Sequence, residues 1–143
     1  SHGRPLMRLF VVLLATILVA CGSPKPPLVI SELEVTKPIP GRHMSAGFFT
    51  LTNNTDEVIS ITGVDSPQFA RVEIHETTVT DGVSRMRKLD ALEVPAQGSV
   101  VLERGGKHLM LMQAQDIGDS VTLQFVSDDA PVLSVDYVFP EDN

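Results

Sequence analysis

The chain has 143 residues, which is enough for one domain with a single hydrophobic core. Its formal net charge is −7 and it has no basic stripe, so it is a poor candidate for binding nucleic acid, which needs clustered Lys and Arg. Its single cysteine excludes a disulfide framework within the chain.

Residues 1–20 are predicted to be an export signal. A short basic start at Met7 and Arg8 precedes an apolar run that is too short for a membrane-spanning helix, and small residues follow it. Residues 1–6 precede the expected start at Met7. We interpret them as a cloning remnant or an upstream misreading, so His2 is given no role.

Cys21 is the predicted site of lipid attachment. Leu-Val-Ala-Cys at 18–21 resembles the lipobox of bacterial lipoproteins, in which the signal is cut before the cysteine and the cysteine then carries lipid. The alternative is an ordinary secretory signal with an incidental cysteine. With Cys21, the proline-rich residues 22–27 would form a stiff tether to a domain over 28–143. This predicts a periplasmic or otherwise extracytoplasmic lipoprotein anchored to the membrane through Cys21.

The rest of the chain consists of short β-like runs separated by turn residues. We expect about nine strands, over residues 28–35, 46–52, 58–64, 70–78, 83–89, 99–103, 108–113, 121–126 and 132–139. In the first strand, alternation would place Val29, Ser31, Leu33 and Val35 on one face. The regular spacing of strands, with no convincing helix, predicts an all-β fold: an antiparallel Greek-key β-sandwich.

Three of these strands carry His or Met side chains on faces that are otherwise polar. Strand alternation would direct Ile74 into the core and His75 away from it. Met86 lies in a strongly charged strand whose packing does not need it. In the strand over 108–113, three potential ligands would share the face opposite the core: His108, Met110 and Met112.

A soft-metal site explains this pattern better than core packing does. A single Met in a strand is usually a gap-filling core residue, and a single His is more often a surface residue than a ligand. Those explanations would have to hold at once for His75, Met86, His108 and Met110. Two imidazoles and two thioethers make a neutral, soft donor set that favours Cu(I) over Zn(II). A blue-copper centre needs a Cys thiolate, which the mature domain lacks.

The same residues resemble the PCu(A)C family of periplasmic copper chaperones. His75, Met86, His108 and Met110 fit the H-x10-M-x21-H-x-M pattern of that family. The flanking text is similar too, as in Val-Glu-Ile-His-Glu-Thr-Thr and Gly-Gly-Lys-His-Leu-Met-Leu-Met, and the resemblance covers roughly residues 28–140. It implies a cupredoxin-like β-sandwich that binds one Cu(I) per chain through these four side chains. It also implies copper delivery to an acceptor, typically a cytochrome c oxidase subunit or another copper chaperone.

Further soft donors lie close to this set in the sequence. Met112 is two residues beyond Met110 on the same expected face, where it would act as a spare thioether or shield the metal. His43 and Met44, just before a strand, form another pair that would contact copper weakly or lie in an exposed loop.

Two alternatives to a membrane-tethered Cu(I) chaperone stay open from the sequence. A copper-buffering or resistance protein would use the same site without an obligatory acceptor. A β-sandwich interaction module would use the His/Met face as a contact patch for another protein, independently of metal. We expect a monomer and no enzyme, because the sequence has no Ser/His/Asp order, no paired carboxylates in a glycine-framed pocket and no nucleotide loop.

Overall fold

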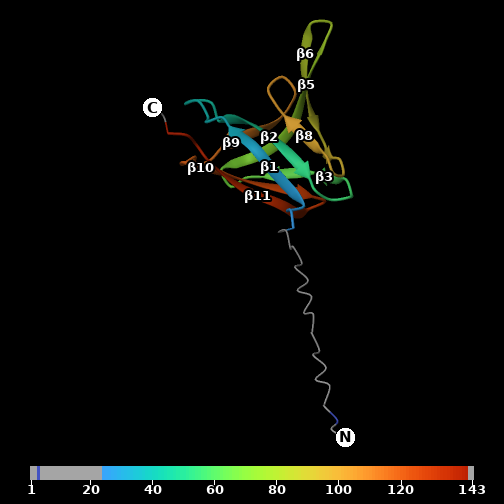
Figure 1. Ribbon diagram of the computed structural model, residues 1–143. Helices are drawn as coiled ribbons and strands as arrows, with labels where there is room; N and C mark the ends of the chain where they lie inside the picture. Colours follow the sequence, from blue (N-terminus) through green and yellow to red (C-terminus); the bar gives the residue numbers. More distant parts are fainter. Residues whose placement is uncertain (1–2, 4–23, 142–143) are drawn as a thin grey trace.

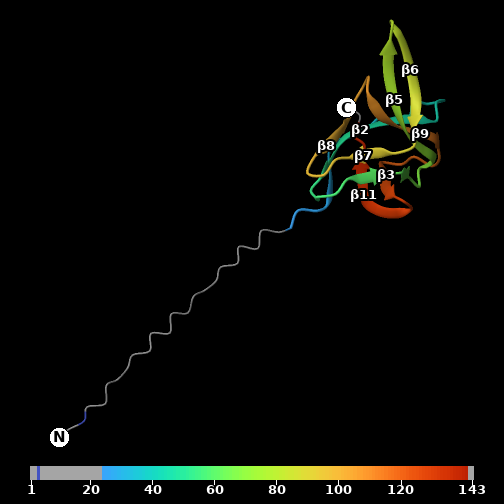
Figure 2. The ribbon, with the colours of Figure 1, turned by 90° about the vertical axis from the view of Figure 1, so that its right-hand side faces the viewer.

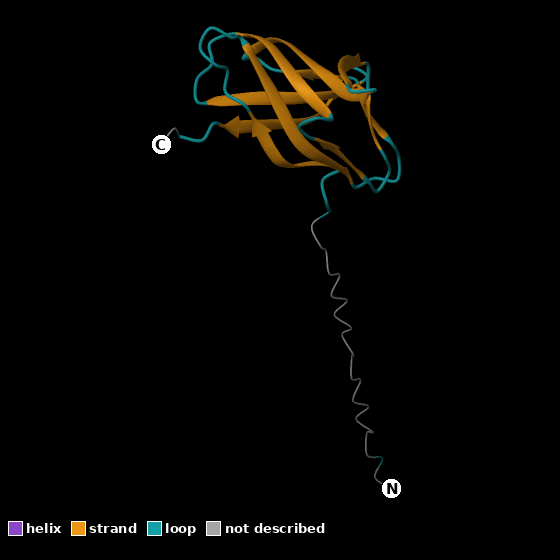
Figure 3. Cartoon of the chain, turned by 90° about the horizontal axis from the view of Figure 1, so that it is seen from above, coloured by secondary structure: helices purple, strands orange, loops and turns teal. Residues whose placement is uncertain are grey.

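A computed structural model describes residue 3 and residues 24–141 of the chain. These residues form strands and no helix, which confirms the predicted all-β class (Figure 3). None of them forms a helix long and apolar enough to cross a membrane. The predicted signal over 1–20 and the predicted lipid site at Cys21 lie outside the described residues, apart from Gly3.

The strands follow one another along the chain with short connections (Figure 1). They are β1 (Leu28–Val35), β2 (Met44–Asn53), β3 (Ile59–Ile61), β4 (Gly63–Asp65), β5 (Phe69–Thr80), β6 (Val83–Leu89), β7 (Leu92–Val94), β8 (Ser99–Leu102), β9 (Lys107–Ala114), β10 (Ser120–Ser127) and β11 (Ala130–Val138).

Two sheets enclose the hydrophobic core. The main sheet has the order β1-β2-β9-β5-β6, with β8 also paired to β2, and the second sheet has the order β11-β10-β4. All the pairs are antiparallel. Phe49 of β2 meets Phe125 of β10 in a T-shaped contact with ring centroids 5.4 Å apart. The other fully buried side chains of these sheets include Leu51, Leu109, Leu111, Val121 and Leu123. These contacts fix the inner face of the main sheet and leave its other face for the site.

The prediction merged β3 with β4 and missed β7. The run over 58–64 divides because its first half pairs with β7, Ile59 opposite Val94, and its second half pairs with β10, Val64 opposite Phe125. β7 is only three residues long and stops before Pro95, so it shows too little alternation to be recognised. Residues 58–64 therefore form two short strands, because their two halves pair with strands of different sheets.

A bulge in β1 overturns the predicted shared face of that strand. The register with β2 shifts between Ser31 and Glu34, where Glu32 has a φ of 55°. An extra residue at a bulge reverses which side chains face inward. Ser31 is therefore exposed, contrary to the prediction. The β1 side chains that pack on the core are Leu28, Ile30, Leu33 and Val35.

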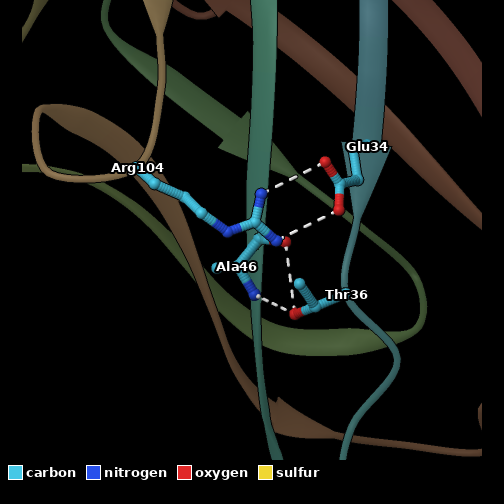
Figure 4. A network of polar contacts seen from close by, with 4 residues as sticks. All are labelled: Glu34, Thr36, Ala46 and Arg104. Atoms are coloured by element: carbon cyan, nitrogen blue, oxygen red, sulfur yellow. Dashed lines mark hydrogen bonds and ion pairs between the residues drawn. The ribbon is translucent and has the colours of Figure 1, made fainter.

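An ion pair holds the turn between β8 and β9 against β1. Arg104 donates hydrogen bonds to both carboxylate oxygens of Glu34, at 3.3 and 3.1 Å (Figure 4). These hydrogen bonds lower the pKa of Glu34. Beside this pair, the backbone N–H of Ala46 donates to Thr36 Oγ1 at 2.9 Å. Together these contacts position the turn that leads into β9, one of the strands of the candidate site.

Candidate metal centre

The outer face of the main sheet brings the four predicted ligands together. His75 on β5 lies directly opposite His108 on β9. Met110, two residues further along β9, lies opposite a β5 residue two before His75, and Met86 on β6 lies opposite a β5 residue two after it. Residues two apart in a strand share a face, as do cross-strand partners. All four side chains therefore belong to the face that the alternation predicted, opposite the core.

The two histidines lie side by side on this face. Their ring centroids are 6.0 Å apart and their planes are inclined at 37°. Such a spacing lets one ion bond to a nitrogen of each ring at about 2 Å. His108 is only 7% exposed. It is therefore more buried than we would expect for a residue on the outer face of a sheet.

The hydrogen bonds of the two rings differ. His108 Nδ1 lies 3.1 Å from the Gly106 carbonyl oxygen, which can only accept, so Nδ1 carries the proton and Nε2 keeps a free lone pair. Both ring nitrogens of His75 are buried, and neither has a hydrogen-bond partner among the described residues. A buried polar atom without a partner destabilises a fold by about 1–3 kcal/mol. A metal ion bonded to His75 would satisfy one of these atoms.

Met86 lies on an extended arm, opposite a β5 residue two beyond His75. The register pairs of β5 with β9 end at Glu76 opposite Lys107, while the β5–β6 hairpin continues beyond them (Figures 1 and 2). Asp81 and Gly82 close this hairpin with φ values of 52° and 77°, as expected for a tight Asp-Gly turn. Met86 is 54% exposed on this arm. Its thioether is therefore the donor that solvent or another protein reaches most readily.

The auxiliary candidates are Met112, Met44 and His43. Met112 and Met44 lie on the same sheet face as the four predicted ligands, on the side of Met110 away from His108. Met44 on β2 lies directly opposite Met112 on β9. Met44 and Met110 both line a cavity of about 240 Å³. Arg71 Nη2 lies 3.6 Å from Met112 Sδ and donates a hydrogen bond to it. His43 directly precedes β2 and lies exposed in the connecting loop, which is one of the two placements expected for it.

Glu73 was not among the predicted site residues, but it lies beside His75. Its Oε1 lies 3.7 Å from His75 Nε2, and its Oε2 lies 3.6 Å from Lys88 Nζ. Only 14% of the Glu73 side chain is exposed. The signal was present in the sequence, because Glu73 precedes His75 by two residues and therefore shares its face.

The donor chemistry of the face is that of a soft-metal site. The described residues form no group of three or more His, Cys, Asp or Glu side chains that could hold a metal ion. The donors that share a face with the histidine pair include the thioethers of Met86 and Met110. Thioether and imidazole donors suit Cu(I).

Sequence comparisons match nearly the whole described domain. A family model described as "Putative lipoprotein LpqE-like" matches residues 28–139. A curated relative, uncharacterized protein RP573 of Rickettsia prowazekii (strain Madrid E), is 28% identical in an alignment of 103 residues that covers 69% of this chain. The chain spans 57% of the length of that relative.

Solved structures share the fold. The solution structure of CuI-DR1885 from Deinococcus radiodurans is 28% identical, covers 82% of this chain and 80% of that one, and has a TM-score of 0.60. The copper-bound PCuAC domain from PmoF2 is 20% identical, covers 78% of this chain and 91% of that one, and has a TM-score of 0.64. The resemblance to PCuAC domains and the cupredoxin-like β-sandwich that it implies are confirmed.

Proposed function

The chain belongs to the LpqE-like family of putative lipoproteins, and we propose that it carries Cu(I) outside the cytoplasm. The observation that carries this proposal is the His75–His108 pair, in which both His75 nitrogens are buried and have no hydrogen-bond partner within residues 24–141. Two thioethers, Met86 and Met110, flank the pair on the same face. The 28% identical DR1885, which was solved as its CuI form, supports copper as the ligand.

In this proposal one Cu(I) is held by His75, Met86, His108 and Met110. All four donors are neutral, so the donor set by itself does not strongly favour Cu(II). The contact between His108 Nδ1 and the Gly106 carbonyl turns Nε2 toward the ion. Met86, on the exposed arm, is the ligand that an incoming donor would displace first. Such ligand exchange would pass copper on without any change in protonation.

The partner in this proposal is a copper-accepting protein, either a cytochrome c oxidase subunit or another copper chaperone. Lipid on Cys21 and the tether over 22–27 would hold the domain near such an acceptor at the membrane. The family description as a putative lipoprotein supports this placement. A copper-buffering protein would share the site but would not release Cu(I) faster when the acceptor is present.

A competitive Cu(I) titration tests the proposal. The full chain is used with Cys21→Ser and His2→Ala, since a free thiol and an N-terminal imidazole would compete for copper. We expect one equivalent of Cu(I) to be taken from a chromogenic Cu(I) chelator under anaerobic conditions. Weak binding without a defined stoichiometry would contradict the carrier proposal. It would favour the alternative of a protein-interaction module, whose partner binding does not depend on metal.

Met112 is proposed as a spare thioether for Met110. In the same background, Met110→Leu is expected to weaken Cu(I) binding about tenfold, because Met112 lies two residues away on the same face and replaces the lost donor. Met110→Leu/Met112→Leu is expected to weaken it about a hundredfold. Competitive titrations of the two variants measure this difference. Equal affinities would show that Met112 only covers the site.

A further inference from the structure

We propose that Glu73 sets how the site discriminates between the oxidation states of copper, by holding a negative charge beside His75 that favours Cu(II) relative to Cu(I). The inference rests on the proposed function. It concerns a residue outside the four-donor set. It follows from the position of the carboxylate within the histidine and thioether cluster.

The geometry places Glu73 next to two of the proposed ligands. It lies directly opposite Met110 in the β5–β9 ladder and two residues before His75 on β5. Its Oε1 is 3.7 Å from His75 Nε2. An ion bonded to His75 Nε2 would therefore lie close to a carboxylate oxygen.

Two cations keep the carboxylate in this position. Arg71 Nε lies 3.7 Å from Oε1, and Lys88 Nζ lies 3.6 Å from Oε2. The Arg71 and Lys88 side chains are 61% and 58% exposed, against 14% for Glu73. Water screens the two cations more than it screens the carboxylate. The two exposed cations therefore offset only part of the Glu73 charge at the neighbouring His75.

This charge acts on the two oxidation states with different strength. The Coulomb energy is proportional to the product of the charges, so a carboxylate attracts a divalent ion twice as strongly as a monovalent ion at the same distance. Without Glu73 the neutral His and Met donors would select Cu(I) more strongly.

Glu76 provides a matched control on the same strand. Because it follows His75 by one residue, its side chain belongs to the opposite face. It too is paired with two cations, Arg87 at 3.2 Å and Lys107 at 3.4 Å. Glu76→Gln therefore removes the same charge and a similar pair of ionic contacts without changing the face that carries the histidines.

The test compares Glu73→Gln and Glu76→Gln in the full chain carrying Cys21→Ser and His2→Ala. Cu(I) affinity is measured against a chromogenic chelator, and Cu(II) affinity is measured with a copper(II) salt in competition with glycine. If Glu73→Gln weakens Cu(I) binding about fivefold, Cu(II) binding should weaken by about the square of that factor, roughly twenty-five-fold. Glu76→Gln should change neither affinity.

Each outcome decides the inference. If Glu73→Gln weakens Cu(I) and Cu(II) binding by the same factor, Glu73 only positions His75, and the proposal is overturned. If neither affinity changes, the charge of Glu73 does not act on the ion, and the proposal is overturned as well. Glu73→Asp keeps the charge and should recover part of the Cu(II) affinity, so it serves as a second test if the Gln variant unfolds. If the parent chain binds no Cu(I) tightly, the proposed function fails. If it binds Cu(I) but the two losses are equal, only this inference fails.

Discussion

Replacing Met86 and Met110 together by leucine is expected to weaken Cu(I) binding by at least about a hundredfold. The change removes both thioethers and leaves the ion with the imidazoles of His75 and His108, which lie side by side. Leucine has nearly the volume of methionine but offers no donor atom, so packing is preserved while coordination is lost. Met86 is exposed and Met110 half-buried, so the fold should tolerate both changes.

The measurement is the competitive Cu(I) titration in the background without the thiol and His2. Met44→Leu is the matched control, because Met44 is an exposed methionine on the same sheet face that lies outside the proposed four-donor set. We expect the control to bind within about threefold of the parent. A double variant that still binds as tightly as the control would refute the assignment of the two thioethers as ligands.

Strand alternation was enough to predict the face on which the site lies. His75 follows the buried Ile74, and His108 precedes the buried Leu109, so period-two alternation directs both imidazoles away from the core. Sequence alone does not reveal which strands are neighbours. The direct pairing of His75 with His108 depends on β5 lying beside β9, an arrangement set by the packing of the two sheets. The resemblance to PCuAC domains supplied this information indirectly, through the spacing of the motif.

Other features depended on local geometry that composition does not encode. The bulge at Glu32 reversed the inward face of β1 by adding one residue. β7 was missed because its three residues are defined by their pairing with β3 rather than by a pattern of their own. The proximity of Glu73 to His75 follows from alternation, but a Glu that shares a strand face with Arg71 resembles part of an ordinary solvated face, so it was given no role.

Asn53→Ala is expected to lower the free energy of unfolding by about 3 kcal/mol. Asn53 is fully buried, and both polar atoms of its side-chain amide make hydrogen bonds. Its Nδ2 donates to the carbonyl oxygens of Glu57 at 2.7 Å and Val94 at 3.1 Å. Its Oδ1 accepts from the backbone N–H and the hydroxyl of Thr55, at 2.9 and 2.7 Å. Alanine would remove the side-chain partner of the Thr55 backbone N–H and of the carbonyl of the buried Val94, whereas Thr55 Oγ1 and the Glu57 carbonyl keep their hydrogen bond to each other at 2.9 Å.

Asn54→Ala is the matched control, since its Nδ2 makes one exposed hydrogen bond, to the Pro26 carbonyl at 3.0 Å. Chemical denaturation of the three proteins measures the difference, and the control is expected to stay within about 0.5 kcal/mol of the parent. Equal stabilities for the two variants would show that water replaces the bonds of Asn53. Asn53 ends β2, while Met44, next to the candidate site, begins it. The Asn53 variant that remains folded should therefore keep the Cu(I) affinity of the parent. Loss of stability without loss of affinity would show that the metal face does not depend on this end of the sandwich.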